Sequence, residues 1–242
     1  MKENQYWLLE KGGIRLPKMF ASASKIDRPV IVKVNEAHRS YERAFFVATS
    51  AEDFETKSSA MVKAGTITKE GLKKAVIEEY VLGAQVNFNF FYSALSDELE
   101  FMGTDARRQT SLDGFLRLDA KTQIELLDSG YKPSMVETGH FTVTIKESLI
   151  EKALEIGQKF VDVTQKHAKP GIIGPFALQG AVSAEKGKEE LVIFDVSMRI
   201  PGSPGTRFTP YTSYLWGRPL SYGERMAMEI REAIDSKRLS EI

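Results

Sequence analysis

The sequence feature that most constrains the fold is a pair of consecutive apolar segments near the carboxyl end, residues 176–184 and 191–200. In both segments apolar residues are interspersed with polar residues, as in β-strands. The charged turn Lys186-Gly187-Lys188 separates the two segments. Two strands with so short a connection pair as a hairpin. The sequence therefore predicts an antiparallel hairpin, which a glycine- and proline-rich loop at residues 202–206 closes.

Polar side chains on this hairpin indicate an oxygen-rich site. Pairing across the turn brings Gln179 and Asp195 toward one point, where two oxygen ligands could hold Mg²⁺. Alternation also sends Asp195, Ser197 and Arg199 to one face. An acid, a hydroxyl and a guanidinium together suit a metal-bound polyphosphate. The alternative to a metal-binding site is the ordinary polar face of a hairpin, and the spacing of the residues alone favours this alternative.

Composition excludes several classes of function. The chain of 242 residues balances 33 basic against 33 acidic residues, so neither nucleic acid nor an anionic membrane surface is the expected main partner. It has no cysteine, which rules out disulfides and thiol chemistry. No apolar run is long enough to span a bilayer, and the first residues are too polar for a signal peptide. We therefore expect a cytoplasmic, globular chain.

Hydrophobic periodicity predicts a mixture of helices and strands, which indicates an α+β fold. The expected helices cover residues 3–11, 50–63, 70–75, 119–127, 146–166 and 222–235, and the further strands cover residues 29–33, 44–49, 76–82, 86–93 and 99–104. The strand at 86–93 alternates apolar residues against Asn87, Asn89 and Phe91, which predicts a half-buried strand. Arg107 and Arg108 follow the strand at 99–104, where they suit an anionic ligand.

Two further residues are candidates on chemical grounds. Lys33 ends a β-branched strand, from which a lysine can reach a phosphate, although a lysine that extends into solvent explains the position too. His140 can donate a hydrogen bond to a ligand, whereas a lone histidine is more often structural. His38 and His167 offer no metal-ligand spacing with it, so a histidine metal site is not expected.

Three motifs carry a family resemblance: Gly171-Ile172-Ile173-Gly174-Pro175-Phe176, the Asp-x-Ser-x-Arg run at 195–199, and residues 217–225, GRPLSYGER. They resemble the archaeal formate-dependent 5-formaminoimidazole-4-carboxamide ribonucleotide synthetases, the PurP family of ATP-grasp ligases. The resemblance implies an α+β ATP-grasp fold in which two lobes clamp a nucleotide. It implies a connecting helix at 1–18 from an absent or shortened N-terminal domain, a small lobe at 19–82 and a large lobe at 83–242.

The resemblance also implies roles for individual residues. For ATP, it implies that Lys33 contacts the phosphates, that the backbone of Tyr80 and Val81 contacts adenine, that Glu79 contacts the adenine amine or the ribose, and that Gln109 makes a further contact. For the substrate, it implies that His140 contacts the aminoimidazole. It also implies that Gln179 and Asp195 bind Mg²⁺ (or Mn²⁺) and that Arg199 stabilises charge during catalysis. Relatives carry an acid where this chain has Gln109, and an asparagine where it has His140. They also carry glycines in the loop at 35–43, which has none here.

The function that the resemblance implies is a step of purine biosynthesis. Formate, ATP and 5-aminoimidazole-4-carboxamide ribonucleotide would react through formyl phosphate, and the family suggests a homo-oligomer. His140 and Gln109 suggest, as a second hypothesis, an ATP-grasp ligase for another carboxylate–amine pair. A third hypothesis, suggested by the loop at 35–43 and the shortened first domain, is a degenerate paralogue that acts as a nucleotide-binding or oligomer-forming subunit.

Overall fold

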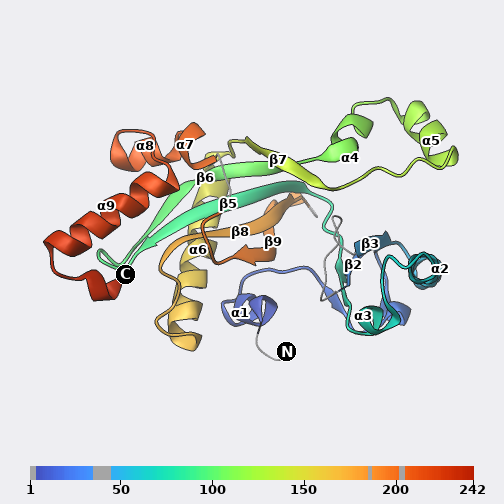
Figure 1. Cartoon of the computed structure of the whole chain (residues 1–242), viewed down its shortest axis with the longest axis horizontal. Helices are drawn as coiled ribbons and strands as arrows, with labels where there is room; N and C mark the ends of the chain where they lie inside the picture. The colour runs from blue at the N-terminus through green and yellow to red at the C-terminus, as the bar shows by residue number, and fades with distance from the viewer. Residues whose placement is uncertain (1–3, 35–44, 185–186, 202–204) are drawn as a thin grey trace. The chain divides into compact units, whose positions relative to one another are not determined.

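The computed structural model describes residues 4–34, 45–184, 187–201 and 205–242 (Figure 1). The chain divides into two compact units, and each is described by itself. The first unit comprises residues 1–16, 82–107 and 139–242, and the second comprises residues 17–81 and 108–138. The predicted small lobe thus lies almost wholly in the second unit, together with residues 108–138. The helix predicted near the amino end belongs to the first unit.

The second unit contains a four-stranded sheet in the order β1 (Met19–Phe20), β4 (Val76–Glu79), β2 (Val30–Lys33), β3 (Phe45–Ala48). Val30, Val32 and Phe46 of this sheet pack against Phe54 of helix α2 (Ala51–Lys63). The Ser50 hydroxyl caps α2 by accepting a hydrogen bond from the Asp53 N–H, and the helix begins where the sequence predicts. The unit also contains η1 (Ala23–Lys25), α3 (Lys69–Lys73), α4 (Thr110–Phe115) and α5 (Ala120–Asp128).

The first unit is built on a five-stranded sheet in the order β7 (Glu137–Thr142), β6 (Glu98–Gln109), β5 (Ala84–Ser93), β8 (Gly174–Ser183), β9 (Glu190–Ser197). The predicted hairpin is confirmed, because β8 and β9 pair antiparallel. Helices α1 (Gln5–Lys11) and α6 (Glu147–His167) bury their apolar side chains against one face of this sheet. Gly157 permits that approach, since a Cβ there would lie 2.8 Å from the Phe90 ring.

The opposite face of this sheet is also covered, which corrects the prediction of a half-buried β5. Asn87, Asn89 and Phe91 are all buried, and Phe91 packs with Met102 and with Tyr222 of helix α9 (Tyr222–Asp235). Further helical segments of this unit are α7 (Gly205–Phe208), α8 (Tyr211–Trp216) and η3 (Leu239–Glu241). No helix in the described part of the chain is long and apolar enough to cross a membrane.

Two β-bulges change which face the later residues of their strands occupy. In β6, Phe101 pairs with Phe90 but Gly103 pairs with Asn89, so Met102 is an extra residue. In β9, Ile193 pairs with Gly180 but Asp195 pairs with Gln179, so the extra residue there lies between Ile193 and Asp195. Strict alternation would send Asp105 to the face of Leu99 and Phe101, and Asp195 to the face of Leu191 and Ile193, which is the apolar α6 face. The bulges turn both carboxylates to the other face.

A buried arginine connects α9 to the sheet. Arg225 has 3% of its surface exposed and forms a two-pronged ion pair with Glu100 of β6, with Nη2 2.6 Å from Oε1. Its Nη1 lies 2.9 Å from Glu229, and its guanidinium lies over the rings of Phe91 and Trp216. Burial lowers the pKa of Arg225, but Glu100 and Glu229 outweigh that effect and raise it. The cation is therefore fully paired inside the unit.

Tyr222 gives a prediction of pH dependence. Its hydroxyl donates to the carbonyl oxygens of Phe90 and Phe176, at 3.1 and 3.2 Å. Burial raises the pKa of Tyr222 well above 10.0, and the nearby charge of Asp105 adds to the rise. Above about pH 10 the unfolded chain loses this proton whereas the folded chain keeps it, so folding stability falls as pH rises.

The comparison that tests this is Tyr222→Phe. We expect this substitution to lower the free energy of unfolding by about 1 kcal/mol at pH 8. Between pH 9 and pH 11, roughly the range around the ionisation of unfolded tyrosine, the variant should lose less stability than the wild type. Urea unfolding at both pH values measures the difference. Parallel losses in the two proteins would show that Tyr222 does not contribute to the alkaline loss.

Candidate functional site

A row of polar residues crosses the sheet of the first unit on the face opposite α6. Asn87 pairs directly with Asp105 on one side and with Gln179 on the other, and Gln179 pairs with Asp195. Directly opposed residues of neighbouring strands place their side chains on the same face. His140 of β7 continues the row, because its Nδ1 lies 2.6 Å from the Asp105 carboxylate. Five strands thus contribute one side chain each to a single polar row.

The most deeply buried member of the row is Asp105, which has no exposed surface. Its Oδ1 accepts a hydrogen bond from Asn87 Nδ2 at 2.8 Å, and its Oδ2 accepts one from Asn89 Nδ2 at 2.6 Å. The His140 ring, which is 17% exposed, contacts Oδ1 as well. A buried carboxylate needs such donors to offset its lost hydration. Asp105 is therefore a fixed anion that holds the side chains around it.

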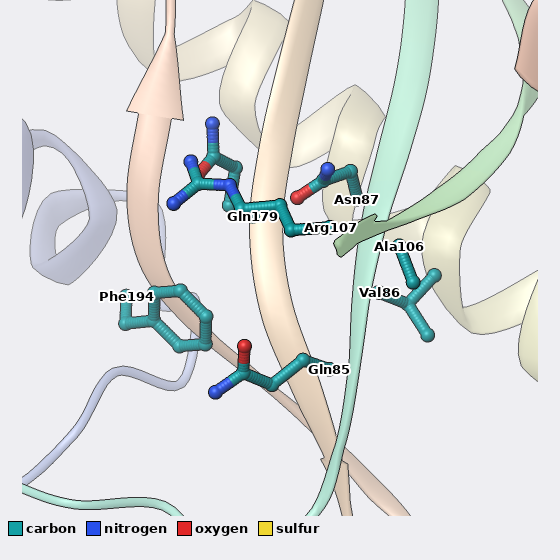
Figure 2. Close-up of a pocket in the computed structure, with 7 residues that line it drawn as sticks. All are labelled: Gln85, Val86, Asn87, Ala106, Arg107, Gln179 and Phe194. Atoms are coloured by element: carbon teal, nitrogen blue, oxygen red, sulfur yellow. The ribbon is translucent and has the colours of Figure 1, made fainter. Parts of the chain in front are cut away.

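Arg107 joins the two halves of the row. Its side chain runs across the sheet to Gln179, with Asn87 beside it (Figure 2), and its Nη2 donates a hydrogen bond to Gln179 Oε1. These residues line a cavity of about 20 Å³ together with Gln85 and Phe194. The amide oxygen of Gln179 thus accepts a hydrogen bond from a cationic side chain of the neighbouring part of the row.

The two predicted metal ligands come from adjacent strands, as the hairpin pattern indicated. The structure brings Gln179 and Asp195 into direct register, and Asp195 is only half-buried. One carboxylate and one amide oxygen fit Mg²⁺, because this ion commonly takes its remaining ligands from phosphates and water. The described residues contain no cluster of three acidic or histidine side chains that could hold a metal by themselves. The metal-binding role of Gln179 and Asp195 stays a prediction.

Arg199 lies outside the strand in which the sequence placed it. Strand β9 ends at Ser197. The alternation of side chains along the strand therefore places Asp195 and Ser197 on one face, but it does not fix the direction of the Arg199 side chain. The Arg199 side chain is exposed and donates to the carbonyl oxygen of Ile200 at 3.1 Å. The expectation that Arg199 lies in the same strand as Asp195 and Ser197 is therefore wrong, because the strand ends at Ser197. The catalytic role of Arg199 stays a prediction.

The remaining nucleotide candidates belong to the second unit. Lys33, at the end of β2, forms an ion pair with Glu78, which is 1% exposed. Glu79 accepts hydrogen bonds from Arg28 Nη1 and from the Lys18 N–H, each at 3.1 Å. Lys33 and Glu79 therefore lie on neighbouring strands and both have partners within the unit.

The structure gives several other candidates local contacts. The Tyr80 N–H donates to the Pro29 carbonyl oxygen at 2.9 Å, and Val81 follows it after β4 ends. Gln109 is the last residue of β6, rather than part of a segment that follows the strand, and its Nε2 donates to the Met135 carbonyl oxygen at 3.3 Å. The glycine-free loop at 35–43 and the turn residue Lys186 lie outside the described residues.

Sequence reasoning missed the part of the row formed by Asn87, Asn89 and Asp105. The available signal was the spacing of two asparagines on one face of a strand with aromatic residues on the other. An apolar environment on both sides makes such amides unusual unless they bind a partner. The sequence predicts a strand over 99–104 that stops before their partner, Asp105, whereas β6 continues to Gln109 and so brings Asp105 opposite Asn87.

Comparison with known proteins identifies the family. A family model described as a domain of unknown function, DUF1297, matches residues 53–242, well over half of the chain. The chain belongs to the DUF1297 family. Curated proteins similar to this DUF1297 chain include two that are each named 5-formaminoimidazole-4-carboxamide-1-(beta)-D-ribofuranosyl 5'-monophosphate synthetase. The one from Methanococcus maripaludis is 38% identical over 97% of the chain, and the one from Methanobrevibacter smithii is 38% identical over 100% of it.

The DUF1297 chain spans less than two thirds of these relatives, 63% and 65% of their respective lengths. Among solved structures, an IMP biosynthesis protein PurP from Thermococcus kodakaraensis matches with a TM-score of 0.67 and 24% identity, over 97% of this chain and 64% of that one. The ADP complex of PurK, an N5-carboxyaminoimidazole ribonucleotide synthetase, matches with a TM-score of 0.54 and 13% identity, over 88% and 50%. The predicted α+β ATP-grasp fold is confirmed.

Proposed function

We propose that this chain carries out, as all or part of a synthetase, the ATP- and formate-dependent formylation of 5-aminoimidazole-4-carboxamide ribonucleotide. The observation that carries the proposal is the polar row, which aligns Asp195, Gln179, Asn87, Asp105 and His140 across one sheet. We assign the metal to one end of this row, at Asp195 and Gln179, and hydrogen bonds to the substrate to the other end. The names of relatives that are 38% identical over nearly the whole chain support the same reaction.

The proposed chemistry has two steps. A formate oxygen attacks the γ-phosphorus of ATP, ADP leaves, and formyl phosphate forms. The amine of the ribonucleotide then attacks the formyl carbon, and inorganic phosphate leaves. The protein positions the reactants and offsets negative charge in both steps, through Lys33 and Arg199 as predicted and through Arg107, which reaches Gln179 on the same face.

Magnesium belongs to the proposal as the ion that neutralises the phosphates. Gln179 and Asp195 would hold it, and when bound it would supply Lewis-acid stabilisation of phosphate oxygens. Glu79 and the backbone of Tyr80 and Val81 remain the proposed contacts to the nucleoside, and Gln109 remains a proposed contact to ATP. A cytoplasmic location and a homo-oligomer complete the proposal, the latter to be measured by sedimentation.

The reaction itself is the test. The purified chain is incubated with Mg²⁺, ATP, formate and the ribonucleotide, and ADP and the formylated ribonucleotide are quantified. We expect both products to form in equal amounts, and omission of formate should abolish the formylated product. Calorimetry with Mg²⁺ and ATP, with and without the ribonucleotide, shows whether the ligands bind. An absence of both products and of binding would contradict the proposal.

A second candidate function rests on His140. The resemblance implies an asparagine at this position, whereas this chain has His140, whose ring contacts the buried Asp105. A histidine in this position suits an ATP-grasp ligase that joins a different carboxylate to a different amine. The same assay with other carboxylates in place of formate, and other amines in place of the ribonucleotide, distinguishes the two candidate functions. Faster ADP formation with another pair would favour the second function.

A further inference from the structure

We infer that helix α5 of the second unit pairs antiparallel with the α5 of a second copy of this chain. The inference rests on the homo-oligomer of the proposed function, to which it assigns a surface, and it does not depend on the reaction. Helix α5 covers Ala120–Asp128 and belongs to residues 108–138 of the second unit. The side chains at the centre of the pairing are Ile124 and Leu127.

Helix α5 is well formed but contains no buried residue. The Asp119 carboxylate caps its start by accepting hydrogen bonds from the backbone N–H groups of Lys121 and Thr122, at 3.1 Å each. Gly130, with a φ of 90°, closes its end, and the Gly130 N–H donates to the Leu127 carbonyl oxygen at 3.0 Å. A helix of 9 residues is marginal in water unless an apolar face of it is packed. Nothing in the described part of the chain buries a side chain of α5.

The apolar side chains of α5 form one exposed stripe. Ala120, Ile124 and Leu127 follow each other at intervals of four and three residues, so they lie on one face of the helix. Ile124 is 58% exposed and Leu127 is 48% exposed. Further exposed apolar side chains lie close in sequence, at Leu116, Leu118 and Tyr131. Burial of such a stripe is favourable, and interfaces between identical subunits are more apolar than other protein interfaces.

The charges of α5 indicate which partner fits the stripe. Lys121 lies in the first turn, whereas Glu125 and Asp128 lie in the second half. Apart from the capping Asp119, this order opposes the helix dipole, which favours acids at the start and bases at the end. An antiparallel copy of the same helix places its Asp128 beside the start of α5 and its Lys121 beside the end. The surface is thus complementary to itself, as a two-fold interface requires.

Helix geometry also puts these charges on the same flank of the stripe. Lys121 and Asp128 are seven residues apart, which is close to two full turns. A two-fold axis that relates two antiparallel helices brings each flank of one helix against the same flank of the other. Lys121 of each copy therefore meets Asp128 of the other. Within one chain Lys121 lies 3.8 Å from Glu125, but both side chains are largely exposed, so this contact leaves Lys121 accessible.

Sedimentation of the full chain over a range of concentrations tests the surface. Ile124→Asp should raise the dissociation constant of the oligomer at least about 100-fold, because the two-fold axis places the changed side chain in the interface twice. The fold should persist, since Ile124 is exposed in the single chain, and circular dichroism checks this. Ile234→Asp is the matched control, because Ile234 is 57% exposed on α9 of the first unit. The control should associate like the wild type.

Exchange of charges tests the antiparallel geometry. Lys121→Glu alone and Asp128→Lys alone each set like charges against each other at two places, so each should raise the dissociation constant about 10-fold. An equimolar mixture of these two variants restores both ion pairs in a mixed dimer, and its association should return to the wild-type value. A mixture that associates no better than either variant alone would overturn the antiparallel pairing.

The outcomes separate the inference from the reaction. A wild-type chain that sediments as a monomer at every concentration would overturn the inference, and so would an oligomer that Ile124→Asp leaves intact. The same samples are assayed for ADP and the formylated ribonucleotide. Product formation by a monomeric wild type would leave the reaction standing while the inference falls. A wild type that associates through α5 but forms no product would leave the inference standing while the reaction falls.

Discussion

Replacement of Arg225 by methionine is expected to lower the free energy of unfolding by about 3–5 kcal/mol. Methionine keeps much of the volume of the arginine stem but removes the charge. Glu100 and Glu229, which are 7% and 4% exposed, would then remain buried without the cation that both contact. The contacts of the guanidinium with the Phe91 and Trp216 rings would be lost as well.

Urea unfolding followed by circular dichroism measures this loss. Arg231→Met is the matched control, because Arg231 is an exposed residue of the same helix, and we expect it to change stability by less than about 0.5 kcal/mol. Addition of Glu100→Gln to the Arg225→Met protein should recover part of the loss, since a neutral amide is cheaper to bury than an unpaired carboxylate. Equal stability of the Arg225 and Arg231 variants would contradict a structural role for the network.

Replacement of Asp195 by asparagine is expected to lower kcat/KM for formylation about 10³-fold. Asparagine has nearly the shape of aspartate, so the pairing of β8 and β9 should persist. The change removes the single carboxylate of the proposed magnesium pair and leaves two neutral amides at positions 179 and 195. Neutral oxygens offset the charge of a divalent cation poorly, and ATP binding should lose its dependence on Mg²⁺.

Calorimetric titration with ATP, in the presence and absence of Mg²⁺, measures the second effect directly. Asp235→Asn serves as the control, since Asp235 is an exposed acid at the end of α9. It should leave both kcat/KM and Mg²⁺ dependence unchanged. Binding of Mg²⁺ and ATP by the Asp195 variant with wild-type affinity would rule out Asp195 as a metal ligand.

Local signals in the sequence predicted much of the secondary structure. The long apolar stripe of α6, the capping serine of α2 and the amphipathic helix at 222–235 depend on residues within a few positions of each other. The short elements β7, α4 and α8 were missed. Gly139 in the middle of β7, with a φ of 150°, is a residue that weakens any strand prediction.

Long-range pairing explains what the sequence could not show about the site. The meeting of Gln179 with Asp195 was foreseen because a short turn joins their strands. The meeting of Asn87 with Asp105 and His140 was not, because it depends on the register of three strands and on the full length of β6. A single sequence contains no local signal for that register. The roles of Lys33, Glu79 and Gln109 remain predictions.

The two β-bulges have a consequence for how the chain tolerates changes in length. Deletion of Met102 or of Phe194, the extra residues of β6 and β9, would leave a regular ladder in which Asp105 and Asp195 keep the face they already occupy. Insertion of one more residue beside either bulge would instead turn the carboxylate toward the layer that holds Phe101 or Ile193. A carboxylate in that layer would have lost its hydration without gaining hydrogen-bond donors. We therefore expect these two strands to tolerate the loss of the extra residue far better than the gain of another one.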